Sequence, residues 1–130
     1  MEWFCKKYNE LSRIELYEVL KIRQEVFIIE QNCHYLDADG HDQYARHLFC
    51  SKDNKIIAYM RVVNSGVIYD HISFGRILVD KKNRKQGLGR EIIQKGLNLF
   101  SKDETIVMSA QVYLKKFYQE FGFKCVGSCE

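Results

Sequence analysis

The sequence predicts a single α/β domain built on a mixed, mostly antiparallel, twisted sheet with helices on both faces. Three features support this fold class. A strand and an amphipathic helix open the chain, two apolar segments joined by a turn follow, and a strand-helix-strand-helix-strand order closes it. The chain has 130 residues, enough for one hydrophobic core, so residues 1–130 are expected to form one domain without a linker.

The first elements are an edge strand and a helix. Residues 2–8 form a short segment of mixed polarity, which suits an edge strand. Ser12 and Glu15 have the spacing of a capping box, in which two residues satisfy each other's backbone N–H groups at a helix start. Apolar residues then recur three to four positions apart, so the helix is expected to run to about Glu30.

A loop and a hairpin are predicted next. Residues 31–44 are rich in acidic and polar side chains and are expected to form a loop. Residues 47–50 and 56–63 are apolar runs, and the turn-prone pair Asp53-Asn54 lies between them. This arrangement is typical of a β-hairpin.

The second half of the chain predicts alternating strands and helices. The expected elements are a strand at 74–79, a helix at 86–100, a strand at 105–110, a short helix at 112–121 and a strand at 123–127. Such an alternation places crossover helices against a sheet that contains parallel strands.

A glycine-containing loop connects the strand at 74–79 to the helix that follows. Its sequence is Arg84-Lys85-Gln86-Gly87-Leu88-Gly89. Glycines at alternate positions let the backbone approach a ligand, and the free N–H groups of a helix N-terminus point together toward negative charge. The loop therefore predicts a site for a phosphorylated cofactor.

Two common nucleotide-binding loops do not fit this segment. A dinucleotide fingerprint needs a third glycine where this chain has Ile92, and a P-loop needs Lys and Ser or Thr after Gly89. The remaining pattern, Arg/Gln-x-x-Gly-x-Gly/Ala, resembles the pyrophosphate-binding motif of the GNAT family of acetyl-CoA-dependent N-acetyltransferases.

Two further segments strengthen the resemblance to the GNAT family. Residues 117–123 are similar to the family's aromatic-Tyr-x-x-x-Gly-Phe segment. Residues 27–33 and 37–40, followed by Arg46-His47, resemble the ElaA-type subfamily. That subfamily usually has Pro after the Cys, whereas this chain has His34, so the shape of the loop is not defined by a proline ring here.

The resemblance implies a GNAT fold and acetyl-CoA as co-substrate, with no metal. In that fold the strand at 74–79 splays away from the strand at 105–110, and pantetheine lies in the gap. The N–H near Leu78 or Val79 would hold the thioester carbonyl and stabilise the developing oxyanion. The residues implied in binding the cofactor are Leu78, Val79, Arg84, Lys85, Gln86, Gly87, Leu88, Gly89 and Arg90.

The resemblance also implies an acid for the leaving thiolate. Tyr118 matches the family tyrosine that protonates it, although its helical spacing with Phe117 and Phe121 is also typical of core packing. A base must take a proton from the cationic acceptor, and Glu30 and His47 are the candidates chosen. Asp37, Asp39 and Asp42 are alternatives, and a water chain can replace a dedicated base.

The acidic loop suggests a site for the acceptor. Asp37 and Asp39 are predicted to form a negative rim that attracts a cationic amine. The same run does not fit a calcium loop, since the sixth and twelfth positions of an EF-hand would be Asp42 and Leu48.

Composition and charge narrow the partners. Five basic residues lie within 81–90, but no aromatic residue is among them, so nucleic acid is not expected as a partner. No long apolar run predicts insertion into a membrane or secretion, which places the chain in the cytoplasm. The five cysteines contain no C-x-x-C pair, which predicts neither a disulfide framework nor a zinc site.

Two functions remain open from the sequence. The first is an N-acetyltransferase that moves acetyl from acetyl-CoA to the primary amine of a small molecule or peptide by direct attack in a ternary complex. The second is a catalytically weak CoA-binding module or sensor. The family's last strand is not evident before Glu130, which predicts strand exchange in a homodimer or a different closure of the sheet.

Overall fold

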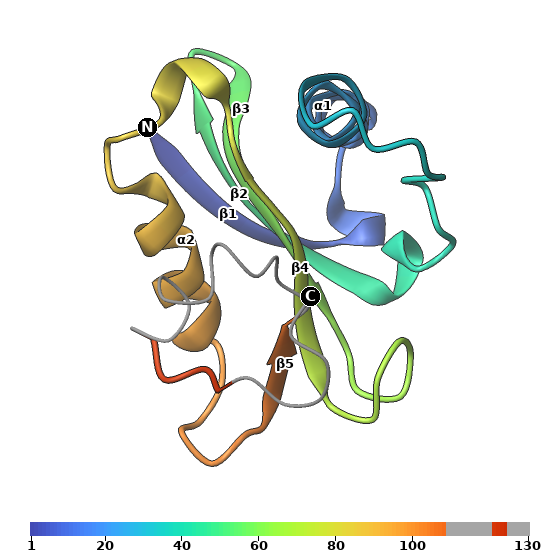
Figure 1. The fold of residues 1–130 in the computed structure, drawn as a ribbon, viewed down its shortest axis with the longest axis vertical. Coiled ribbons are helices and arrows are strands. Elements are labelled where there is room, and N and C mark those ends of the chain that lie inside the picture. The colour runs from blue at the N-terminus through green and yellow to red at the C-terminus, as the bar shows by residue number, and fades with distance from the viewer. Residues whose placement is uncertain (109–120, 125–130) are drawn as a thin grey trace.

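A five-stranded sheet lies between two helices, with α1 on one face and α2 on the other (Figure 1). The computed structural model describes residues 1–108 and 121–124. The strands follow one another in the order β1-β2-β3-β4-β5. Their bounds are Glu2–Lys7, Ala45–Lys52, Lys55–Val63, Ile72–Val79 and Ile106–Met108, and the helices are α1 (Arg13–Arg23) and α2 (Leu88–Leu97). The predicted α/β class is confirmed.

The capping box predicted at the start of α1 is present. The Glu15 N–H donates to Ser12 Oγ at 3.0 Å, and the Ser12 N–H donates to Glu15 Oε1 at 2.8 Å. After α1 the chain continues as a π-helical segment, Gln24–Glu30, so the predicted end at about Glu30 is confirmed. This segment carries the chain into the loop at residues 31–44.

The predicted hairpin is formed by β2 and β3, which pair antiparallel. Asp53 and Asn54 both have positive φ, at 51° and 62°. Two left-handed residues in succession match the right-handed twist of the flanking strands, and Asn and Asp tolerate this conformation better than most residues. The local sequence therefore sets this turn.

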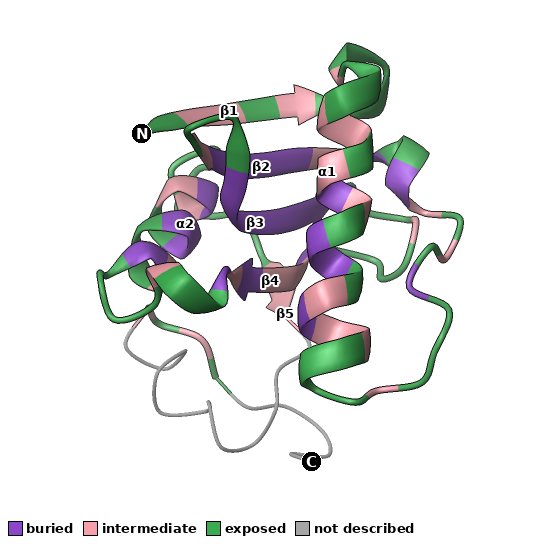
Figure 2. Cartoon of the chain, turned by 90° about the horizontal axis from the view of Figure 1, so that it is seen from above, coloured by how far each residue is buried: buried purple, intermediate pink, exposed green. Residues whose placement is uncertain are grey.

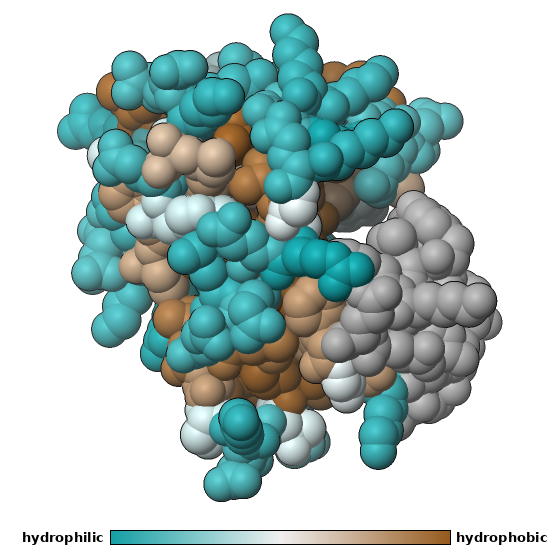
Figure 3. All heavy atoms as spheres, turned by 90° about the vertical axis from the view of Figure 1, so that its left-hand side faces the viewer, coloured by the Kyte–Doolittle hydropathy of each residue, from teal (hydrophilic) through white to brown (hydrophobic). Residues whose placement is uncertain are grey.

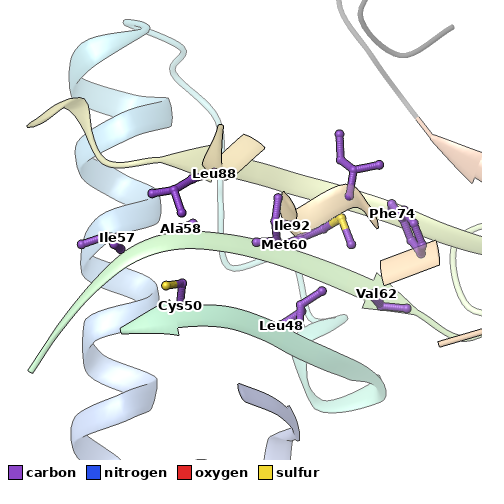
Figure 4. Close-up of a cluster of buried hydrophobic side chains, with 10 residues drawn as sticks. Leu48, Cys50, Ile57, Ala58, Met60, Val62, Phe74, Leu88 and Ile92 are labelled. Carbon is purple, nitrogen blue, oxygen red and sulfur yellow. The ribbon is translucent and has the colours of Figure 1, made fainter. Parts of the chain in front are cut away.

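The core has two layers, one on each face of the sheet. Near the middle of the sheet, β3 is buried along its length except at Lys55, and most of β2 is buried (Figure 2). Beneath α2, the side chains of Met60 and Phe74 pack with Ile92 and their neighbours (Figure 4). Beneath α1, a second cluster contains Val19 and Tyr59. Burial on both faces anchors the two helices that flank the candidate site.

The C-terminal part of the sheet is described only in part. Strand β5 pairs parallel to β4 from Ile72 opposite Ile106 to Phe74 opposite Met108. The predicted helix at 112–121 and strand at 123–127 lie almost wholly outside the described residues, and so does the predicted exchange of a strand between two chains.

On the face that carries α2, hydrophobic surface is visible between hydrophilic side chains (Figure 3).

Candidate functional site

The glycine loop forms a turn onto the N-terminus of α2. Gly87 is the N-cap residue and has φ of 81°, a left-handed conformation that side chains disfavour. A Cβ built on Gly87 meets no atom within 4 Å, so the space in front of this backbone is open. Helix α2 begins at Leu88, two residues later than predicted, and its first N–H groups lack intrahelical acceptors. The geometry fits a cradle for phosphate groups.

Two of the predicted cofactor-binding residues have other contacts. The side chain of Leu88 is buried in the core, so only its backbone can reach a ligand. The Arg84 guanidinium donates from Nη1 to Glu30 Oε1 at 2.9 Å and from Nη2 to Glu30 Oε2. The hydrogen bond and charge of Arg84 lower the pKa of Glu30. A carboxylate held in this way is a weak base at neutral pH.

Strand β4 contains a β-bulge. The pairs on either side of the register shift are Tyr59 with Leu78 and Arg61 with Gly75. Arg76 and Ile77 therefore lie opposite one residue of β3. Arg76 has φ of 50°, so the extra residue occupies the left-handed region. Phe74 packs beneath α2 whereas Leu78 packs beneath α1, which shows that the bulge exchanges the faces of the strand.

The backbone of Val79 faces away from β3. The Asp80 N–H donates to the Ile57 carbonyl at 2.8 Å, and alternate residues of a strand direct their backbone groups to opposite sides. The Val79 N–H and carbonyl consequently point to the outer edge, where Arg84 Nε donates to that carbonyl at 3.0 Å. By the same alternation, the Leu78 N–H points into the ladder with β3. Of the two predicted amides, only that of Val79 is directed outward.

That edge of β4 is open over the bulge among the described residues. The described pairing with β5 ends at Phe74 opposite Met108, so no described strand covers the segment from Gly75 to Val79. The predicted splay can be followed only to this point, because residues 109 and 110 lie outside the described chain.

An arginine–aspartate network holds the acidic loop against the sheet. Its members are Arg23, Arg61, Arg76, Asp37, Asp39 and Asp42, which form six ion pairs at 2.7 to 3.3 Å. Asp37 is 6% exposed and accepts from Arg23 and Arg76. Asp39 accepts two hydrogen bonds from Arg61, at 2.8 Å each. These contacts neutralise both carboxylates and argue against the predicted negative rim.

The network lowers the pKa values of Asp39 and Asp42. Burial acts to raise the pKa of Asp42, but hydrogen bonds from Arg23 and Arg61 and their charges bring it below its ordinary value. Asp39 follows the same pattern, with Arg61 as its main partner. Both groups therefore stay ionised at neutral pH and serve the fold as anions.

A cavity of about 260 Å³ adjoins this network. It is bordered by the bulge in β4, by the acidic loop and by the connection between β3 and β4. The residues that line it include Asp39, Tyr69, Gly75 and Arg76. The cavity lies beside the segment of β4 that precedes Val79, which makes it a candidate space for an acceptor.

His47 is placed inside the protein. Its side chain is fully buried, its Nδ1 lies 2.6 Å from the Tyr59 hydroxyl, and its Nε2 lies 3.0 Å from the Asp42 carbonyl. Burial is the main cause of its lowered pKa. With both ring nitrogens occupied, His47 has a structural environment, and the geometry argues against its predicted use as base.

The sequence analysis did not identify the three arginines of the arginine–aspartate network. Arg23 lies in the apolar repeat of the first helix, and Arg61 and Arg76 lie within apolar strand segments. An arginine is rarely buried without a partner, so these positions were a usable signal that acidic residues must come to them. The nearby acidic loop was the obvious source. Tyr118, the predicted acid, lies outside the described residues.

Comparison with known proteins identifies the family. The profile described as "Acetyltransferase (GNAT) domain" matches residues 14–129. The chain belongs to the GNAT family. A UPF0039 protein of Synechocystis is 42% identical to this GNAT protein, and the match covers 98% of this chain and 85% of the relative. Protein ElaA of Escherichia coli is 34% identical over 95% of this chain and 84% of its own.

Solved structures agree with this assignment. An acyl-CoA N-acyltransferase from Pseudomonas aeruginosa superposes with a TM-score of 0.91 at 32% identity, over 98% of this GNAT chain and 90% of its own. Escherichia coli ElaA superposes with a TM-score of 0.87, over 92% and 84% of the two chains. The predicted ElaA-type resemblance and the GNAT acyl-CoA N-acyltransferase fold are confirmed.

The described part of this GNAT protein comprises residues 1–108 and 121–124. None of its helices combines the length and the apolar character that crossing a membrane requires. In the same residues, no three His, Cys, Asp or Glu side chains come together in a way that could hold a metal ion.

Proposed function

We propose that this GNAT protein transfers an acetyl group from acetyl-CoA to a primary amine of a small molecule or peptide. The observation that carries the proposal is the outward-facing backbone of Val79 at an open strand edge, close in sequence to the Gly87 cradle. A thioester carbonyl and a pyrophosphate need these two kinds of donor, a strand amide and a helix N-terminus.

The residues have separate tasks in this proposal. The α2 amides after Gly87 and the basic side chains around them, Lys85 and Arg90 included, bind the phosphates, while the Val79 N–H donates to the thioester oxygen. The amine nitrogen attacks the carbonyl carbon, the C–S bond breaks, and Tyr118 protonates the departing sulfur. The lone pair of the attacking nitrogen forms the new amide bond, and the proton that this nitrogen loses passes to solvent.

We infer that water, rather than a dedicated side chain, removes that proton. The paired carboxylate of Glu30 has a lowered pKa, and His47 is buried with both nitrogens engaged. Neither group is arranged to accept a proton from an amine in the cavity beside β4. Turnover should then rise with pH as more of the acceptor becomes deprotonated.

Calorimetry with acetyl-CoA tests the cradle. Gly87→Glu should abolish micromolar binding by bulk and charge, and Gly66→Glu is the matched control. Gly66 also has positive φ, at 86°, and an equally open surrounding, but lies in the connection between β3 and β4. Equal loss in both variants would assign the effect to backbone strain and would count against the cradle.

Release of free thiol in the presence of an amine panel tests turnover. We expect wild type to release CoA with at least one amine and Tyr118→Phe to lower kcat by about 100-fold. Binding of acetyl-CoA without thiol release for any amine would instead support a CoA-binding module or sensor.

A further inference from the structure

The direction of the Val79 backbone depends on the bulge at Arg76. Gly75 pairs with Arg61, and Tyr59 pairs with Leu78, so one extra residue of β4 lies between these two pairs. In a regular strand, Val79 would share the backbone direction of Gly75, because the two are an even number of residues apart. The extra residue reverses this, and Val79 faces the open edge instead of β3.

The bulge is held in a conformation that arginine disfavours. Arg76 has φ of 50°, which glycine adopts freely and other residues rarely adopt. Such a residue remains left-handed only where surrounding contacts oppose its relaxation. The backbone of β4 therefore needs an anchor at this position.

Asp37 supplies the anchor from the acidic loop. Arg76 Nε donates to Asp37 Oδ1 at 2.9 Å, and Arg76 Nη2 donates to the Asp37 carbonyl at 3.2 Å. The guanidinium also lies over the Tyr35 ring, 5.2 Å from its centroid. Asp37 itself is held by Arg23 of α1, which is fully buried and donates to its carboxylate and its carbonyl at 2.8 and 2.9 Å.

We propose that Asp37 and Arg76 form a positioning pair that maintains the β4 bulge and thereby directs the Val79 amide toward the thioester. The expected effect of this pair on kcat rests on the proposed acetyl transfer. Its expected effect on the conformation of β4 does not. The pair also ties the loop at residues 31–44 to the same strand, so the wall of the acceptor cavity and the thioester-binding amide are joined by one contact.

Replacement of Arg76 by two small residues separates backbone conformation from side-chain contact. Arg76→Ala removes the anchor and keeps a Cβ that disfavours positive φ, whereas Arg76→Gly removes the anchor and accepts positive φ. We expect kcat to fall about tenfold in Arg76→Ala, and Arg76→Gly to recover at least about threefold of that loss. Acetyl-CoA affinity should change little, and Arg13→Ala, exposed on α1, should behave as wild type.

A rescue experiment tests the role of Asp37. Asp37→Asn should lower kcat, and adding Arg76→Gly should restore only part of it, because Arg23 loses the Asp37 carboxylate in both variants and keeps Asp42 as its charged partner. A purely structural role of Asp37 predicts no rescue. Equal kcat in Arg76→Ala and Arg76→Gly would overturn the proposal, because it would show that the left-handed backbone is not what matters.

The amide spectrum gives a readout that does not need turnover. In ¹⁵N-labelled protein, Arg76→Ala should shift the resonances of Ile77, Leu78 and Val79 and speed hydrogen exchange there, while Arg76→Gly should preserve them. If wild type shows no acetyl transfer, the proposed function fails and this measurement alone decides the positioning pair. Unchanged β4 amides in a folded Arg76→Ala variant would refute it.

Discussion

Glu30 and Arg84, 54 positions apart in the sequence, form a bidentate ion pair beside the proposed cofactor cradle. Glu30 ends the π-helical segment that leads into the acidic loop, and Arg84 is the first residue of the phosphate-binding motif. Arg84 also donates to the Val79 carbonyl. One arginine side chain thus connects the acidic loop, the open edge of β4 and the glycine loop before α2.

Glu30→Gln should tighten acetyl-CoA binding. The neutral amide removes a negative charge that opposes the phosphates and frees the Arg84 guanidinium to meet them. We expect the Kd to fall about two- to fivefold at low salt, as suits a partly exposed ion pair. Calorimetry measures this, with Glu18→Gln on α1 as control. Weaker binding would mean that the ion pair preorganises the cradle, and a large fall in kcat would restore Glu30 as the base.

His47→Gln should lower stability at neutral pH and flatten its pH dependence. Burial lowers the pKa of His47 below the value of about 6.5 in the unfolded chain, so the unfolded state takes up a proton first as pH falls. The stability contribution is complete above about pH 6.5 and is lost as pH falls toward the folded pKa. Urea denaturation at several pH values between about 7 and 5 measures this. Normal stability with abolished turnover would instead support His47 as base.

Asp39→Asn distinguishes the network from a negative rim. Loss of the charge that pairs with Arg61 and Arg76 should lower the free energy of unfolding by about 1 to 3 kcal/mol at neutral pH. Because the folded pKa of Asp39 is lowered, its contribution is complete above about pH 4 and is lost as pH falls further. Denaturation curves test this, with exposed Asp70→Asn as control. A raised KM for the amine with unchanged stability would support the rim.

Gly96→Ala should destabilise the contact between α2 and the sheet. A Cβ at Gly96 would overlap the Met60 methyl group and lie 3.1 Å from the Phe74 ring. Both of those side chains are buried, so we expect a loss of about 1 to 3 kcal/mol. Denaturation of Gly96→Ala, Met60→Val and the double variant forms a thermodynamic cycle. A double variant less stable than the sum of the two single changes would contradict the overlap.

Much of the fold could be predicted because its signals are local. The Ser12 capping box, the Asp53-Asn54 turn and the start of α2 near Gly87 each depend on residues a few positions apart. The apolar runs that became β3 and β4 were recognised for the same reason. Arg61 and Arg76 interrupt these runs, and periodicity alone does not say which distant group satisfies a buried charge.

The candidate site likewise has a part that could be predicted from the sequence and a part that could not. The glycine loop that we propose binds phosphate could be recognised from the sequence, since glycine spacing before a helix is a local property. The choice of Val79 over Leu78 could not, because a shift of one residue in the pairing of β3 with β4 decides which amide faces outward. The neutralisation of Asp37 and Asp39 likewise required the loop to be seen against Arg23, Arg61 and Arg76.

The sequence by itself determined the order of the described elements, the turn residues, the glycine loop before α2 and the family, because these depend on chemistry carried by neighbouring residues. Only the tertiary structure decided the partners of the buried arginines, the burial of His47 and the outward direction of Val79. These depend on contacts between segments far apart in the chain and on strand register, which the packing of the whole domain sets.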